Sequence, residues 1–451
     1  MNLGFETVGN ATLIIHDKKP ILATDPWITP NAYFGSWSCS HQIPEQQMDS
    51  ILNSQYVWFS HGHPDHLNYD SLPKLKGKKI LLPDHLGGRI AKSLRSDGFE
   101  VTVLKDRHWY PLSKNVRVFC WADHYQDAIL LVEVGDNLLI NCNDAVDFGR
   151  NFFIKNLAKK YRHSFILSIS SIGIADMMNY YDEEGRFIVP KNYLERPPSG
   201  IENAEKADRF GAEYFVPSSS FHFFQRTDSA WANEFSRPIE ELYKGYESKS
   251  SRILPAFISF DLERHDYRLL NPKPLELILK DPKQFGDDWS EPLQSDEVPL
   301  VTQYFKKVEH LGSFLDFINI KVGGVDHRIE WKNKHCHRGI TLEVPRASLM
   351  TAVRHEVFED LLIGNFMKAT LHGSWFPQDL SPEFSVYVGK YSDNGLAHKE
   401  KEVREYLAIY RKRFIEFKSY YWLPKLRFAL GGIVRKLPCL NFLTSYTRAA
   451  R

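Results

Sequence analysis

Four metal-capable side chains crowd into six consecutive positions, directly behind a short apolar run. The stretch "YVWFSHGHPDH" places His61, His63, Asp65 and His66 after residues 56–59, which form a strand-like segment. Histidine accounts for only 18 of 451 residues, so chance seldom gathers three so closely. Imidazole nitrogens and carboxylate oxygens are the ligands of first-row metals. The run therefore predicts a metal site, and one such loop can supply two metals.

The segments around this run predict layers of sheet and helix. Short stretches rich in β-branched and aromatic residues recur through residues 1–150, bounded by Gly, Pro, Asp or Lys. Helical patterns interrupt them, as in residues 84–99, where Leu86, Ile90 and Leu94 share one face. Such a mixture is typical of a layered α/β or α+β domain.

A change in amino-acid composition near residue 270 predicts a second structural unit. At 451 residues the chain exceeds the usual size of a single hydrophobic core. The Pro- and Asp-rich stretch 269–299 is typical of a connection. Beyond it we expect an amphipathic helix pair over 348–373 and a strand over 383–392. The expected divisions are a catalytic domain over 1–270, a C-terminal α+β domain over 271–410 and a basic amphipathic tail over 411–451.

Charge and cysteine usage narrow the class of protein. The formal net charge of +1 neither demands nor excludes a nucleic-acid partner, and we expect none. Five cysteines are scattered singly, which indicates a reducing, cytoplasmic compartment. No export signal or uncharged stretch of eighteen apolar residues occurs. The tail 417–451 has seven Lys or Arg and no acid, and two interpretations stand for it: peripheral contact with an anionic membrane, or a helix docked on the protein body.

The metal-capable run resembles the H-x-H-x-D-H signature of the metallo-β-lactamase superfamily. "GNATLII" followed by "ILATDPW" resembles the opening hairpin of its lactonase-like branch, and "WADHYQDAILLVEVGDNLLINCNDA" resembles its next two motifs. The resemblance implies a four-layer αβ/βα sandwich with a dinuclear metal site at one sheet edge. The C-terminal α+β domain would then be an extension of this sandwich.

Within the superfamily the sequence is more similar to the CMP-N-acetylneuraminate hydroxylase family. "SHGHPDHLNYDSLPKL" carries that family's S-H-x-H-x-D-H-L-x-Y-x-x-L-x-K-L pattern, and "SKNVRVFCWADHYQDAILLVE" is similar to its K-N-(L/V)-R segment. The family also has an N-terminal Rieske iron-sulfur module with C-x-H and C-x-x-H ligand pairs. Here Cys39 and His41 mimic only the first pair. We therefore expect the module to be absent and electrons to come from a separate Rieske or ferredoxin partner.

The resemblance implies seven metal ligands. His61, His63 and His124 are expected on one metal ion, Asp65, His66 and His222 on the other, and Asp144 between them. The family's last histidine would fall near Gln225 or Arg226, so His222 is taken as its replacement. We expect Asp65 and Asp144 to be catalytic, Asp25 to support the metal loop, and Arg226 to bind an anionic substrate through its planar guanidinium.

The ligand types leave the reaction open, because histidine and carboxylate suit iron, zinc and manganese alike. Two irons and an electron donor would make a monooxygenase that hydroxylates an anionic sugar or nucleotide-linked substrate, as the resemblance implies. We favour this hypothesis. The alternative is a phosphodiesterase or lactonase type of hydrolase, in which two metals lower the pKa of a bridging water toward neutrality. A third hypothesis, a scaffold with a relic site, is disfavoured by the complete set of candidate ligands.

Overall fold

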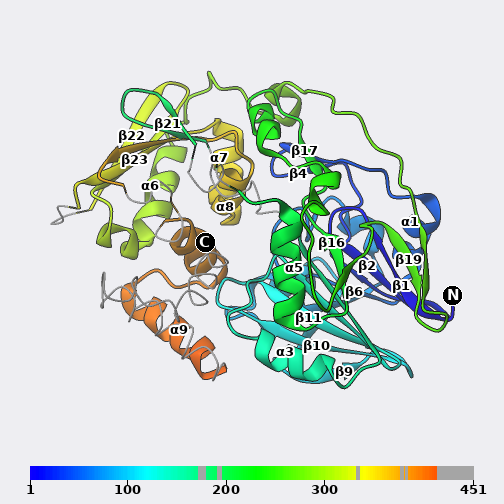
Figure 1. Cartoon of the computed structure of the whole chain (residues 1–451). Coiled ribbons are helices and arrows are strands. Elements are labelled where there is room, and N and C mark those ends of the chain that lie inside the picture. Colours follow the sequence, from blue (N-terminus) through cyan, green and yellow to red (C-terminus); the bar gives the residue numbers. More distant parts are fainter. Residues whose placement is uncertain are drawn as a thin grey trace, which may run out of the picture.

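The larger part of the chain is built on two facing β-sheets (Figure 1). The computed structural model describes residues 1–170, 179–189, 194, 196–331, 336–375, 380 and 384–413. The first sheet runs, in spatial order, β20 (Asp266–Leu269), β19 (Ile258–Asp261), β1 (Leu3–Val8), β2 (Thr12–Asp17), β3 (Lys19–Thr24), β6 (Tyr56–Trp58), β7 (Lys79–Pro83) and β8 (Glu100–Leu104). The second runs β18 (Arg252–Ile253), β16 (Tyr214–Ser218), β13 (His163–Ile169), β12 (Asn137–Asn143), β11 (Ala128–Val134), β10 (Val116–Ala122) and β9 (Trp109–Pro111).

Both sheets are buried on their two faces, which explains why their strands are apolar almost throughout. In β11, Leu130 and Val132 pack into the core between the sheets, whereas Ile129 and Leu131 pack against helices on the other face. The helices outside the second sheet are α3 (Asn151–Ala158), α5 (Ser199–Phe210) and α9 (Glu400–Arg413).

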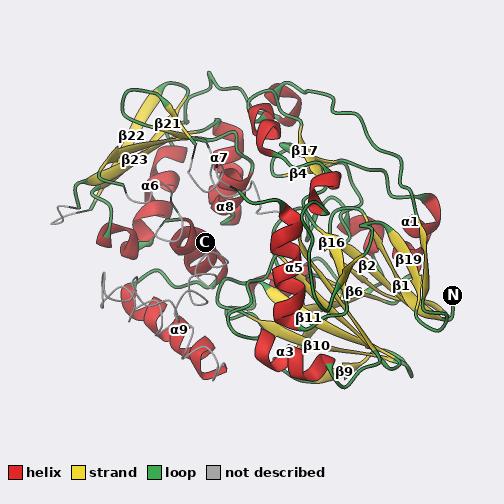
Figure 2. Ribbon diagram, viewed as in Figure 1, coloured by secondary structure: helices red, strands yellow, loops and turns green. Residues whose placement is uncertain are grey.

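The outer face of the first sheet is covered in the same way. Ile14 of β2 packs there with Ile51 of α1 (Glu45–Asn53) and Leu94 of α2 (Arg89–Ser96). Helix, sheet, sheet and helix therefore follow one another (Figure 2). The four-layer αβ/βα sandwich expected from the sequence is confirmed.

A third sheet forms the C-terminal extension, and it lies on the opposite side of the molecule from the N-terminal strands (Figure 1). Its order is β15 (Phe187–Ile188), β14 (Tyr180–Tyr181), β24 (Lys368–Gly373), β23 (Arg338–Glu343), β21 (Phe317–Val322) and β22 (Val325–Glu330). It shares a core with α6 (Glu297–Lys307), α7 (Arg346–His355) and α8 (Phe358–Ile363). The α+β extension is thus confirmed, and it takes two short strands from the first half of the chain.

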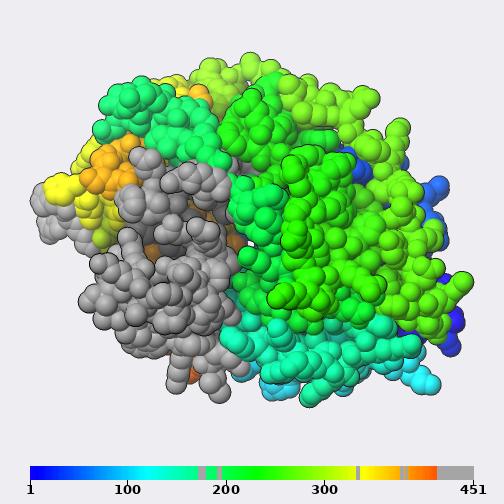
Figure 3. Space-filling model, in the orientation of Figure 1, coloured from blue at the N-terminus to red at the C-terminus, as the bar shows by residue number. Residues whose placement is uncertain are grey.

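The space-filling view shows one face of the molecule. On this face, the few visible blue atoms of the N-terminal residues lie beside the green segments that follow residue 200, most of them toward the right edge (Figure 3). A small sheet joins these distant parts directly. In it, β17 (His222–Phe224) pairs antiparallel with β5 (Trp37–Cys39), which in turn pairs with β4 (Asn31–Ala32).

Two expectations for the C-terminal unit have different outcomes. The helix pair expected over 348–373 is confirmed as α7 and α8 only as far as Ile363, and the last residues of that range form strand β24 instead. The strand expected over 383–392 is wrong: in its described part the chain forms a π-helix, Val386–Asn394. Most of this π-helix is buried, including Val386 and Val388. Burial on several sides removes the contrast between faces on which a strand prediction depends.

The membrane prediction for the tail is not tested by the structure, because residues 417–451 lie outside the described part of the chain. Within the part that is described, no helix combines the length and the apolar character needed to cross a membrane. The domain boundary near residue 270 also stays a prediction.

The core between the sheets gives a test of the fold. Leu139 of β12 is fully buried in it. Replacing Leu139 with Ala should lower the free energy of unfolding by about 2–5 kcal/mol, because the lost methyl groups leave a cavity. The matched control Leu279→Ala changes a side chain that is 53% exposed and should cost under about 0.5 kcal/mol. If urea denaturation showed the same loss of unfolding free energy for Leu139→Ala and Leu279→Ala, this packing would be contradicted.

Candidate metal centre

The candidate ligands follow strands that end at the same edge of each sheet. Strand β6 runs parallel to β3. Strands β10 and β12 point the same way, because each is antiparallel to β11 between them. Asp25 follows β3, the histidine loop follows β6, and Asp144 follows β12. The topology therefore brings side chains that are far apart in sequence to one place.

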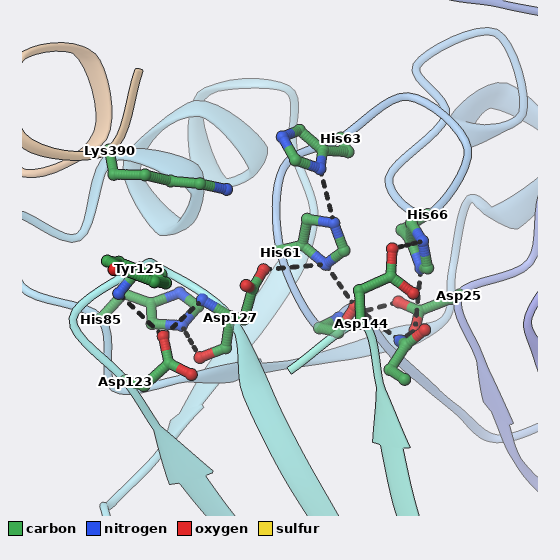
Figure 4. A network of polar contacts seen from close by, with 12 residues as sticks. Asp25, His61, His63, His66, His85, Asp123, Tyr125, Asp127, Asp144 and Lys390 are labelled. Atoms are coloured by element: carbon green, nitrogen blue, oxygen red, sulfur yellow. Dashed lines mark hydrogen bonds and ion pairs between the residues drawn. The ribbon is translucent and has the colours of Figure 1, made fainter. Parts of the chain in front are cut away.

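Asp25 ties three of these loops together. One carboxylate oxygen accepts a hydrogen bond from the backbone N–H of Ser60 at 2.8 Å. The other accepts one from the side-chain amide of Asn143, next to Asp144, and lies 3.5 Å from Nδ1 of His66. Asp25 is fully buried. This is the geometry that a residue supporting the metal loop requires (Figure 4).

His66 lies among three carboxylates. Its Nε2 is 3.2 Å from Oδ2 of Asp65 and 3.3 Å from Oδ2 of Asp144, and its Nδ1 faces Asp25. Burial lowers the pKa of His66, but Asp65 and Asp144 raise it far above its usual value. Asp65 also accepts hydrogen bonds from Tyr33 at 2.5 Å and from Asn10 at 2.8 Å. The site thus has an excess of buried negative charge that favours cations.

His222 follows β16, which runs parallel to β13 and therefore to β12, and the charges of the same carboxylates act on it. Its ring stacks on Trp37 with centroids 3.4 Å apart, which holds its orientation. Neither ring nitrogen has a hydrogen-bond partner although the side chain is buried. Burial lowers the pKa of His222 to about 4, against the charges of Asp65 and Asp144. The ring is therefore neutral near pH 7, the form in which histidine binds metals.

His61 and His63 make a second group beside the first. Nε2 of His61 lies 2.9 Å from Nδ1 of His63, so both nitrogens face one point (Figure 4). The potential ligand atoms of His61, His66 and Asp144 all lie within 4.8 Å of one another. Burial, followed by the charges of His66 and His63, keeps the pKa of His61 well below its usual value.

His124 does not join this group. Its ring packs against Tyr125 and Phe148, with centroids 4.5 Å away in each case, and the charges that act on it are those of arginines. Among the described residues it belongs to no group of three potential ligand atoms within 4.8 Å of one another, and neither do His63, Asp127 and His222. The structure thus places the ring of His124 beside the aromatic residues outside the second sheet, and its place on the first metal stays a prediction.

Asp127, three residues later, lies on the other side of the His61 ring. Its Oδ1 lies 3.8 Å from Nδ1 of His61, not beside the Nε2 that faces His63, and has no hydrogen-bond partner. The charges of His63 and Asp144 both act on its carboxyl, and burial raises its pKa. Gln126 has a φ of 64° and lies in the turn where the chain changes direction. Sequence analysis missed Asp127 because the family pattern directs attention to the histidine of the same stretch.

Two further residues reach the site from the C-terminal unit, and sequence analysis had no signal for them. Glu359 of α8 lies 3.3 Å from Nε2 of His63, and Lys390 of the π-helix lies 3.4 Å from Glu359. Burial raises the pKa of Glu359, but Lys390 and His63 bring it down to about 2. The carboxylate is therefore ionised.

Arg226 is not available to a substrate. Its guanidinium is fully buried and forms ion pairs with Asp287 at 2.7 Å and Asp228 at 2.8 Å. It also lies 3.9 Å from the ring centroid of Phe366. The expectation that Arg226 binds an anionic substrate is wrong, because two carboxylates already use its planar fork to join the catalytic domain to the C-terminal unit.

Comparison with known proteins agrees with the resemblance seen in the motifs. No protein-family model matches the chain. The chain is 26% identical over 141 residues to the cytidine monophosphate-N-acetylneuraminic acid hydroxylase of Gorilla gorilla gorilla, a region that is 29% of this chain and 23% of that protein. With the Danio rerio hydroxylase it shares 28% over 129 residues, or 27% and 22% of the two chains. The matched region thus spans about a quarter of the length of these relatives.

Solved structures match part of the chain at low identity and low TM-score. The isothiocyanate hydrolase from Delia radicum gut bacteria is 15% identical, with a TM-score of 0.36, and the match covers 57% of this chain and 98% of that one. CmlA, a diiron β-hydroxylase from Streptomyces venezuelae, is 12% identical, with a TM-score of 0.34 and coverage of 58% and 54%. The metallo-β-lactamase fold protein YhfI from Bacillus subtilis is 11% identical, with a TM-score of 0.33 and coverage of 55% and 88%.

The role of Arg226 can be tested by removing its charge. Arg226→Met leaves the buried carboxylate of Asp287 without its ion-pair partner and should lower the free energy of unfolding by about 3–5 kcal/mol. Arg186→Met, at an ion pair on the surface, should leave the unfolding midpoint nearly unchanged. If Arg226→Met instead preserved stability and raised only the KM for substrate, the structural assignment would fail.

Proposed function

We propose that this chain is a dinuclear metalloenzyme of the oxygenase type that acts on a small anionic substrate. The proposed ligands are His61, His63 and Asp127 for one metal, Asp65, His66 and His222 for the other, and Asp144 between them. This set keeps six of the seven ligands that the sequence implied and replaces His124 with Asp127. To bind the same metal, the Asp127 carboxylate would have to move from Nδ1 of His61 toward the Nε2 that faces His63.

Buried polar atoms without hydrogen bonds support the presence of cations. Both ring nitrogens of His222, Oδ1 of Asp127 and Oδ1 of Asp144 are enclosed and have no hydrogen-bond partner. Leaving such groups unsatisfied is costly in a protein interior. Two divalent metals would satisfy them and would also balance the carboxylates around His66.

The oxygenase is favoured by the proposed replacement of His124 by Asp127, which rests on the position of Asp127 beside His61. This replacement turns the first site into two histidines and one carboxylate, His61, His63 and Asp127. Such a set with open positions is typical of non-haem iron oxygenases. When bound, iron would supply the dioxygen chemistry, with electrons from a separate Rieske or ferredoxin donor. Zinc or manganese in the same ligands would favour the hydrolase alternative.

The protein's own side chains orient the ligands and limit solvent. Tyr33 and Asn10 fix the Asp65 carboxylate through two hydrogen bonds. Trp37 covers one face of the His222 ring. The Asp144 side chain is 27% exposed, whereas those of His61 and His66 are nearly or fully enclosed. A substrate would therefore approach the pair of metals from the side of Asp144.

The substrate class rests on the relatives' printed names. Those relatives act on a cytidine monophosphate-linked N-acetylneuraminic acid, an anionic nucleotide sugar, and this chain matches only part of their length. We therefore propose an anionic sugar or nucleotide-linked sugar as substrate, with hydroxylation of a C–H bond as the reaction.

Metal stoichiometry tests the ligand set. Asp127→Asn should lose one of two metal equivalents, because a neutral amide is a much weaker ligand than a carboxylate. His222→Ala should lose the other. His124→Gln, the matched control, should retain both. Elemental analysis after gel filtration gives the metal content, and circular dichroism checks the fold. If His124→Gln lost one metal equivalent and Asp127→Asn kept both, His124 would be the ligand of the first metal, as the sequence implied.

Metal identity tests the reaction type. Protein purified from its own host should contain two irons, whose optical spectrum changes on chemical reduction and again on exposure to air. With reduced ferredoxin and a panel of anionic sugars and nucleotide sugars, dioxygen should be consumed in proportion to hydroxylated product. Zinc or manganese, together with hydrolysis of a phosphodiester or lactone and no dioxygen uptake, would replace the oxygenase with the hydrolase.

A further inference from the structure

A short chain of charges connects the C-terminal unit to the metal loop. Nε2 of His63 lies 3.3 Å from Oε2 of Glu359 in α8. The same Oε2 lies 3.4 Å from Nζ of Lys390 in the π-helix. All three side chains are mostly buried, with 16%, 16% and 10% of their surface exposed. Figure 4 shows Lys390 reaching from the C-terminal unit toward the space beside His61 and His63.

The two nitrogens of His63 face different partners. Nδ1 faces Nε2 of His61 at 2.9 Å, where the proposed first metal would lie. Nε2 faces the Glu359 carboxylate, which can only accept a hydrogen bond when ionised. A carboxylate at Nε2 therefore favours the tautomer with its proton on Nε2. That tautomer leaves the lone pair of Nδ1 free to bind a metal.

The packing around Glu359 allows little freedom. An added Cβ at Gly389 would lie 2.6 Å from Oε2 of Glu359 and 2.8 Å from its Cβ, so the π-helix contacts α8 closely at this glycine. A cavity of about 20 Å³ lies beside them, lined in part by Gly62 and His63, and has room for about one water molecule. π-helical turns are uncommon and often occur at functional sites. Here the π-helix places Lys390 next to Glu359.

We infer that Glu359 and Lys390 are positioning residues of the metal centre: Glu359 sets the tautomer and orientation of His63, and Lys390 holds Glu359 in place. The inference rests on the proposed function, since it takes His63 as a metal ligand. Its consequence is that the C-terminal unit, which supplies no proposed ligand, controls the affinity of the first metal site.

The test uses the full chain, stripped of metal and titrated with Co²⁺, whose visible spectrum reports each site. Wild-type protein should bind two equivalents. Glu359→Gln should weaken one of them about 10- to 100-fold in competition with a chelator, the range typical for loss of a residue that orients a metal-bound histidine, and should change the Co²⁺ bands of that site. The other equivalent should be unaffected, because its ligands do not contact Glu359.

Variants of Lys390 separate positioning from a general effect on folding. Lys390→Met should weaken the same equivalent, and Lys390→Arg should restore it, because a guanidinium keeps the charge beside Glu359. The control Glu309→Gln removes a carboxylate from an exposed ion pair with Lys399 in the same unit and should bind Co²⁺ as the wild type does. If Glu359→Gln does not fold, the Met and Arg variants of Lys390 decide the question.

The outcomes distinguish this inference from the proposal beneath it. Failure of the wild type to bind two equivalents of Co²⁺ would refute the dinuclear centre itself. Two equivalents bound with unchanged affinity and spectrum in Glu359→Gln and Lys390→Met would leave the centre standing and overturn the positioning role. Equal weakening of both equivalents, without rescue by Lys390→Arg, would also overturn it, because that pattern indicates loss of structure.

Discussion

Buried negative charge is the constraint on which the rest of the site depends. Asp25, Asp65 and Asp144 surround His66, and Asp127 stands beside His61, all in an interior that favours neutral groups. The backbone N–H of Ser60 and the amide of Asn143 stabilise Asp25, but they cannot neutralise four carboxylates. Cations are the simplest remedy, and neutral histidines arranged around the same space provide their other ligands. The proposed metals would therefore contribute to stability as well as to reaction.

The fold meets this constraint by joining two sheet edges and then closing over them. Strand ends of both sheets supply the proposed ligands, and the pairing of β17 with β5 fixes His222 against Trp37. The C-terminal unit is attached by polar contacts at several points, such as Arg226 with Asp287 and Tyr406 with the carbonyl of His124. These contacts hold the C-terminal unit against the catalytic domain.

Much of the site was predictable because short motifs next to strands carry it. Strand ends determine where these motifs lie: the loop of His61 to His66 follows β6, Asp25 follows β3 and Asp144 follows β12. The sheet topology then brings these strand ends together. Asp127 was missed because local turn geometry, with Gln126 at positive φ, decides whether His124 or Asp127 faces inward. Glu359 and Lys390 could not be predicted from the sequence. Glu359, which contacts His63, and Lys390, which contacts Glu359, lie about three hundred residues from His63 in the chain, and these contacts depend on how the third sheet packs. The prediction for Arg226 failed because the neighbouring Asp228 and the distant Asp287 both pair with it.

The choice of Asp127 over His124 also changes the electrostatics of the pair of metals in a direction that bears on the reaction. Each added carboxylate lowers the net charge of a metal site, and net charge is one of the main controls on its reduction potential. A third aspartate would stabilise the more oxidised state of iron, which suits a centre that must give electrons to dioxygen. The same charge would reduce the Lewis acidity on which hydrolysis depends. A ligand set with more carboxylates would therefore favour redox chemistry over hydrolysis. This difference is the physical reason why we place the oxygenase before the hydrolase.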